Sequence, residues 1–168
     1  TRAVPREIPD ADRLRRGPAY DDPSLAGSPA EPAVGDWPTY RCDPARSGYN
    51  PLAVPAELTP LWQTPVGGRL SSVVIADGRL LVAAIDAHTV HALAADTGKQ
   101  LWSFTAGGRV DSPPTVWRGR VLFGSADGYV YCLRAADGAL CWRFRAAPVD
   151  RRMVAFDQVE SVWPVHGS

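Results

Sequence analysis

Residues 92–102 read Ala-Leu-Ala-Ala-Asp-Thr-Gly-Lys-Gln-Leu-Trp, and residues 132–142 read Cys-Leu-Arg-Ala-Ala-Asp-Gly-Ala-Leu-Cys-Trp. The two stretches start forty residues apart, and each has the pattern of a short strand, a tight turn and a second strand that ends in Trp. Gly98 and Gly138 supply the positive φ that such a turn needs. A period of about forty residues with four short strands per unit is typical of propeller blades. The sequence therefore predicts an all-β fold built from four-stranded antiparallel blades.

The two copies resemble the repeat of the pyrroloquinoline-quinone-dehydrogenase-like β-propellers, Ala-x-Asp-x-x-Thr-Gly-x-x-x-Trp, in which the Trp is wedged between neighbouring blades. The matching positions are Ala92, Thr97, Gly98 and Trp102 in the first copy, and Gly138 and Trp142 in the second. The copies depart from the motif at Ala94, where the family usually has Asp, at Cys132 and at Asp137. The resemblance implies a propeller, but not one function, because this repeat serves enzymes, lipoproteins and binding scaffolds alike.

Size and composition narrow the class of protein. The chain has 168 residues, 45% of them hydrophobic, and a formal net charge of zero, which suits a globular domain without a basic field for nucleic acid. No apolar run approaches the roughly 20 residues of a membrane-spanning helix. No signal peptide is visible, and the sequence begins at Thr1. We therefore expect neither nucleic-acid binding nor a membrane span.

The chain divides by composition into three parts. We expect a Pro-rich linker at residues 1–35, a lead-in segment at 36–57 and a partial propeller at 58–168. The propeller divides into an outer strand (58–66), a first blade (67–106), a second blade (107–147), an insertion (148–159) and the start of a third blade (160–168). Two complete blades fall short of the about four that a closed ring needs. We therefore interpret the sequence as a fragment rather than a small complete β-meander, and the linker implies a domain before it.

Turn signals divide the two blades into strands. The expected strands are 71–76, 79–85, 89–94 and 99–105 in the first blade, 112–117, 120–125, 129–134 and 139–145 in the second, and 161–166 as the innermost strand of a third. Trp62 lies forty residues before Trp102, so residues 58–66 are expected to be the outer strand of a blade whose other strands lie beyond residue 168. The residues assigned to the structural motif are Trp62, Gly98, Trp102, Gly138 and Trp142.

Charged residues recur just before the innermost strands, at the expected mouth of the channel. Alignment of the repeats places Asp111 and Glu160 at equivalent positions, with Arg69 and Arg109 two residues before that position in their own blades. These four residues are the candidate ligand site, either for a polar ligand or, through oxygen atoms, for a hard cation. The alternative is that they are solvated turn residues or pair with one another.

The resemblance also raises a quinoprotein hypothesis. Enzymes of that family hold the quinone over calcium with Asn, Glu and a catalytic Asp, and often carry a disulfide between adjacent cysteines. The only Asn here is Asn50, and no two Cys are adjacent. No catalytic residue is assigned, no cofactor is evident, and pyrroloquinoline quinone with calcium belongs only to the enzyme alternative. The three His lack the spacing of a metal motif. Cys132 and Cys141 flank an expected hairpin, and a cross-strand disulfide between them would be possible in an oxidising compartment.

The sequence favours a binding or scaffolding module, exported or periplasmic, that takes a protein or a small polar ligand on the propeller face. One alternative is a quinone-dependent dehydrogenase whose catalytic blades are absent. Another resembles the propeller lipoprotein of outer-membrane protein assembly, which binds a partner through rim loops. Capture of a protein by the insertion at 148–159 would favour this last alternative.

Overall fold

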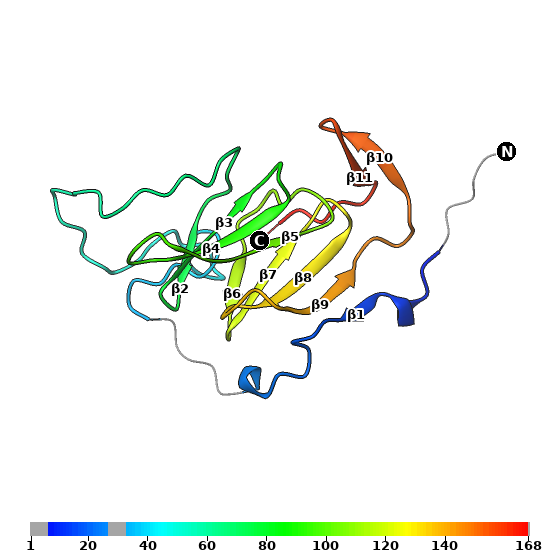
Figure 1. The fold of residues 1–168 in the computed structure, drawn as a ribbon, viewed down its shortest axis with the longest axis horizontal. Helices are drawn as coiled ribbons and strands as arrows, with labels where there is room; N and C mark the ends of the chain where they lie inside the picture. The colour runs from blue at the N-terminus through cyan, green and yellow to red at the C-terminus, as the bar shows by residue number, and fades with distance from the viewer. Residues whose placement is uncertain (1–6, 27–32, 168) are drawn as a thin grey trace.

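The computed structural model describes residues 7–26 and 33–167. Two antiparallel sheets stand side by side (Figure 1). The first holds β2 (Val74–Ala76), β3 (Arg79–Ala84), β4 (Thr89–Ala94) and β5 (Gln100–Thr105). The second holds β6 (Thr115–Trp117), β7 (Arg120–Gly124), β8 (Tyr129–Arg134) and β9 (Leu140–Arg145), with β1 (Leu14–Arg16) added beside β9. The predicted all-β fold of antiparallel four-stranded blades is confirmed.

The hydrophobic core lies between the two blades. Blade one contributes the buried side chains of Leu81, Val90 and Ala92, and blade two contributes Val121 and Leu133. Apolar residues alternate along these strands, so one face of each sheet points to its neighbour.

Three aromatic rings complete this core. Phe123 stacks on Tyr131 with ring centroids 5.3 Å apart, and Phe104 of blade one meets Tyr131 edge-on at 5.7 Å. Such contacts add to the free energy gained from burial alone.

The motif tryptophans join each unit to the next. The indole Nε1 of Trp102 donates to the carbonyl of Ala135 at 3.0 Å, and Trp62 makes the equivalent bond to Ala95 at 2.9 Å. Each ring covers a glycine: a Cβ placed on Gly138 would lie 2.7 Å from Trp102, and one on Gly98 would lie 2.4 Å from Trp62. Real Cβ atoms do not approach so closely, so both positions require glycine.

The strands differ from expectation at the ends of the repeat. Residues 58–66 carry no strand although Trp62 has its expected contact, and β2 and β6 begin three residues later than predicted. Of the expected strand 161–166, only Ser161 lies in a strand, at the end of β11 (Gln158–Ser161). There, Ser161 and Val165 donate single backbone bonds to Ala126 and Ser125, which do not make a ladder. A strand needs a continuous partner, and none lies beside these segments within the described residues.

The insertion forms a β-hairpin. Strand β10 (Arg152–Ala155) pairs with β11 (Gln158–Ser161), and Phe156 and Asp157 turn the chain with φ of 51° and 59°. Figure 1 shows this hairpin, in orange and red, standing out beyond the two sheets. Glu160 and Ser161, which we expected at the start of a third blade, therefore belong to the hairpin.

Part of the expected linker is bound to blade two. Residues 13–25, which we call the N-terminal strap, include β1 and the 3₁₀ helix η2 (Pro23–Leu25), and follow the 3₁₀ helix η1 (Asp10–Asp12). The strap runs along the outer edge of β9 (Figure 1). Neither of these two short helices is of a length that could cross a membrane, and no other helix lies in the described part of the chain.

Candidate functional site

Three of the four candidate residues come together at the base of the hairpin. Arg109 pairs with Glu160 through Nε and Oε1 at 2.5 Å, and its Nη2 lies 3.3 Å from Oδ2 of Asp111. The side chains of Arg109 and Glu160 are only 3% and 2% exposed. A buried charge pair is tolerated because each partner compensates the other, so this arrangement fixes the position of Glu160 and of the hairpin that carries it.

Arg69 lies apart from this cluster. Its Nη2 pairs with Oδ1 of Asp86 at 3.0 Å, and both side chains are at least half exposed. Asp111 contacts Arg109 and, through Oδ2, Nδ1 of His166 at 3.0 Å.

The hairpin also rests on blade one. Gln158 Oε1 lies 2.5 Å from Nε2 of His88, and Gln158 Nε2 donates to the carbonyl of Asp86 at 3.2 Å. Phe156, at the tip, lies over the Arg109 guanidinium with 4.0 Å between the charge centre and the ring centroid. These contacts hold the hairpin to both blades, so it presents a defined surface rather than a loose loop.

The hairpin exposes several large apolar side chains. Val154, Phe156 and Val159 are 76%, 72% and 56% exposed, and Met153 is also exposed. Val154 and Val159 are cross-strand neighbours, and exposed apolar side chains that lie together are typical of protein contact sites. The sequence indicates an insertion here. Because the insertion has no counterpart in the other repeat units, the repeat does not predict the pairing of β10 with β11.

A buried network next to the core was missed by the sequence analysis. Asp127 accepts from the Tyr131 hydroxyl at 2.5 Å and from the Tyr129 backbone N at 3.1 Å. Burial, followed by the charge of Asp127, raises the pKa of Tyr131 to about 12. Asp127 lies between the expected strands 120–125 and 129–134, where the sequence indicates only a turn; the signal for the network is the pair of tyrosines two and four residues later.

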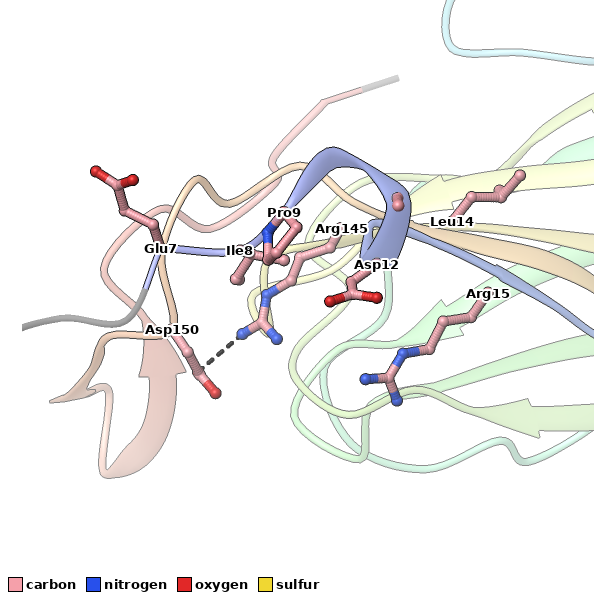
Figure 2. Close-up of a pocket in the computed structure, with 9 residues that line it drawn as sticks. Glu7, Ile8, Pro9, Asp12, Leu14, Arg15, Arg145 and Asp150 are labelled. Atoms are coloured by element: carbon pink, nitrogen blue, oxygen red, sulfur yellow. Dashed lines mark hydrogen bonds and ion pairs between the residues drawn. The ribbon is translucent and has the colours of Figure 1, made fainter.

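A pocket of about 460 Å³ lies between residues 7–15 and the end of β9. Figure 2 shows Arg145 reaching Asp150 beside Ile8 and Pro9. Arg145 Nη2 lies 2.8 Å from Asp150 Oδ1, and its Nη1 donates to the Tyr129 hydroxyl at 3.2 Å. The Arg145 charge is thus already compensated within the chain.

The described residues do not fit a quinone and calcium site. No group of three or more His, Cys, Asp or Glu that could hold a metal ion occurs among residues 7–26 and 33–167. The amide of Asn50 donates to the carbonyl of Asp36 at 3.0 Å, within the lead-in segment. Cys42, Cys132 and Cys141 are free thiols. No chemical step through a quinone follows from this donor set.

The matching protein family and the two matching relatives share one description. The family described as outer membrane protein assembly factor BamB matches residues 55–161. BamB of Burkholderia pseudomallei (strain K96243) is 37% identical over 97 residues, which cover 56% of this chain and 25% of that protein. BamB of Moranella endobia (strain PCIT) is 35% identical over 74 residues, covering 44% and 19%. The chain thus spans about a quarter or less of the length of these relatives.

The fold has a solved counterpart in a larger enzyme. The crystal structure of quinohemoprotein alcohol dehydrogenase from Comamonas testosteroni superposes with a TM-score of 0.56 and 27% identity, over 66% of this chain and 19% of that chain. Its likeness supports the propeller architecture, and the family match covers more than half of the sequence. The chain therefore belongs to the family of outer membrane protein assembly factor BamB.

Proposed function

We propose that this chain is a binding module that holds a protein partner of the outer-membrane assembly machinery through the β10–β11 hairpin. The observation that carries the proposal is the set of exposed apolar side chains on the hairpin, with Val154 and Phe156 more than 70% exposed. The names of the relatives point to assembly of outer membrane proteins, and an exported location is part of the same proposal.

The anchoring of the hairpin supports a binding role. Glu160 at its base is fixed by Arg109, and Gln158 is fixed by His88 of blade one. A surface held in one conformation loses little entropy on binding, and an exposed aromatic ring with aliphatic neighbours is the kind of residue that dominates interface energies.

A binding measurement with two matched variants tests the proposal. The probes are purified soluble domains of the outer-membrane assembly machinery, titrated against the full chain by fluorescence anisotropy. Val154→Ser and Phe156→Ser should each weaken binding about tenfold. Val54→Ser is the control, because Val54 is also exposed, at 69%, but lies in the lead-in segment.

Three outcomes are distinguishable. Loss of affinity in the two hairpin variants alone supports the proposal. Equal affinity in all variants would show that the hairpin is not the contact surface. No binding by the unsubstituted chain would overturn the proposed function.

No dehydrogenase role is proposed. The likeness to the quinohemoprotein enzyme is one of architecture, and the described residues offer no donor set for the cofactor.

A further inference from the structure

The N-terminal strap is bound to blade two by its backbone. Gly17 N donates to the carbonyl of Cys141 at 2.8 Å, Ala19 N donates to Leu140 at 3.0 Å, and Arg145 N donates to Arg13 at 2.8 Å. Ala19 is only 2% exposed. A Cβ on Gly17 would lie 2.1 Å from the carbonyl oxygen of Leu140, so the strap approaches β9 as closely as glycine permits.

Two thiols lie beneath the strap. Cys132 on β8 and Cys141 on β9 are 0% and 2% exposed, and they pack with Ala19 in one cluster. The ladder shifts at this point: Cys132 faces Trp142 and Leu133 faces Leu140, so Cys141 is the extra residue of a β-bulge. The two thiols are close enough for each to influence the pKa of the other.

We propose that Cys132 and Cys141 form a redox-active dithiol, and that the N-terminal strap controls the access of a disulfide oxidant to it. The site takes a small-molecule or protein disulfide as its substrate. It does not depend on the hairpin or on the proposed partner.

The exchange balances without any other reactant. The Cys141 thiolate attacks one sulfur of the disulfide, forming a mixed disulfide and expelling a first thiolate. The Cys132 thiolate then attacks Cys141 Sγ, closing the Cys132–Cys141 bond and expelling a second thiolate. The two cysteines lose two electrons and two protons, and the oxidant becomes two thiols.

Burial keeps the dithiol unreactive while the strap is seated. Burial, followed by the neighbouring Cys141 thiol, raises the pKa of Cys132 to about 12, and burial also raises the pKa of Cys141. Only the thiolate attacks a disulfide, so reaction requires the strap to open and admit water. The charged groups beside the pair are Arg120, Arg134 and Asp22.

One ion pair between the strap and blade two can be used to test whether the strap controls access to the dithiol. Asp22 of the strap pairs with Arg134 of β8, which also binds Asp137 at 2.5 Å. Asp22→Asn removes a charge of the strap without touching either cysteine. Asp21→Asn is the matched control, because Asp21 is the adjacent carboxylate and is exposed.

The experiment treats the folded full chain with oxidised glutathione and follows disulfide formation by non-reducing tryptic mass mapping. Trypsin cuts after Arg134, between the two cysteines, so a disulfide would link peptides 121–134 and 135–143. We expect this link in the unsubstituted chain, and a rate about two- to fivefold higher in Asp22→Asn, as loss of a partly exposed ion pair allows. Gly17→Ala, which cannot seat the strap, should raise the rate further.

Each outcome decides the matter. A 121–134 to 135–143 link that forms faster in Asp22→Asn than in Asp21→Asn supports the proposal. The same link at equal rates in all variants would show that the strap does not control the access of the oxidant to the dithiol. If glutathione adds only to Cys42, or if no link forms even in Gly17→Ala, there is no redox-active dithiol.

Discussion

Trp102 of blade one lies against Gly138 of blade two, and its indole N–H donates to the carbonyl of Ala135 at 3.0 Å. Trp62 repeats this contact on Gly98 one unit earlier. The blades are therefore joined by a contact that recurs with the sequence period, and its energy can be measured by substitution.

We expect Gly138→Ala to destabilise the chain more than Gly78→Ala. Both glycines have positive φ, at 74° and 69°, so alanine costs about 1–2 kcal/mol at either position. Only at Gly138 would the Cβ also strike Trp102, adding about 1–3 kcal/mol of overpacking. Urea unfolding measures both variants. Equal losses would mean that Trp102 moves aside without cost.

Removal of the charge of Glu160 should be costly. Glu160→Gln leaves the buried Arg109 guanidinium with Asp111 as its remaining carboxylate. We expect a loss of about 3 kcal/mol, the lower end of the range for a broken buried pair, because Asp111 stays in place. Asp86→Asn is the control: its pair with Arg69 is exposed and should contribute at most about 1 kcal/mol. Similar losses for the two variants in thermal unfolding would contradict this prediction.

The Tyr131 hydroxyl should make the fold sensitive to alkali. Burial and the charge of Asp127 raise the pKa of Tyr131 from 10.0 to about 12, so the folded state holds this proton more tightly than the unfolded state. The resulting stabilisation is complete below about pH 10 and is lost as the pH rises through about 12.

Thermal unfolding across this range tests the assignment. Tyr131→Phe should be less stable than the parent near neutral pH, because Asp127 loses a donor, and the difference should shrink as the pH approaches 12. Tyr49→Phe, at an exposed ring, is the control. A constant difference at all pH values would exclude Tyr131 as the titrating group.

Pyrroloquinoline quinone with calcium should leave the melting temperature unchanged. The described residues offer no cluster of three or more His, Cys, Asp or Glu for the ion, and the amide of Asn50 is engaged by the backbone of Asp36. A ligand present at a hundred times its Kd would stabilise the folded chain by about 2.7 kcal/mol. A saturable rise of that size in a thermal melt would contradict the expectation and revive the dehydrogenase alternative.

The repeat made the blades predictable. Glycines and tryptophans at fixed spacing mark the turns and the contacts between blades. The sheets, the turns and the Trp102 contact could therefore be predicted from this pattern. The aligned positions also indicated that Arg109, Asp111 and Glu160 lie near one another, and the structure brings these three together. Arg69 does not join them, because it pairs with Asp86.

The strap and the hairpin were beyond this kind of prediction. The strap is seated by backbone bonds and by small residues, Gly17 and Ala19, which leave no hydrophobic periodicity to detect. The hairpin turns at Phe156 and Asp157, and phenylalanine is not a typical residue for positive φ. Both depend on contacts between distant parts of the chain, which local patterns do not contain.

The pairing of Leu14 with Phe144 sets an order of events during synthesis. The strap leaves the ribosome before β9, the strand that it pairs with and the last strand of blade two to be translated. At 5–20 residues per second the strap waits roughly ten seconds without a partner. During that interval the backbone of residues 14–16 has no partner strand, so it is open to pairing with other chains.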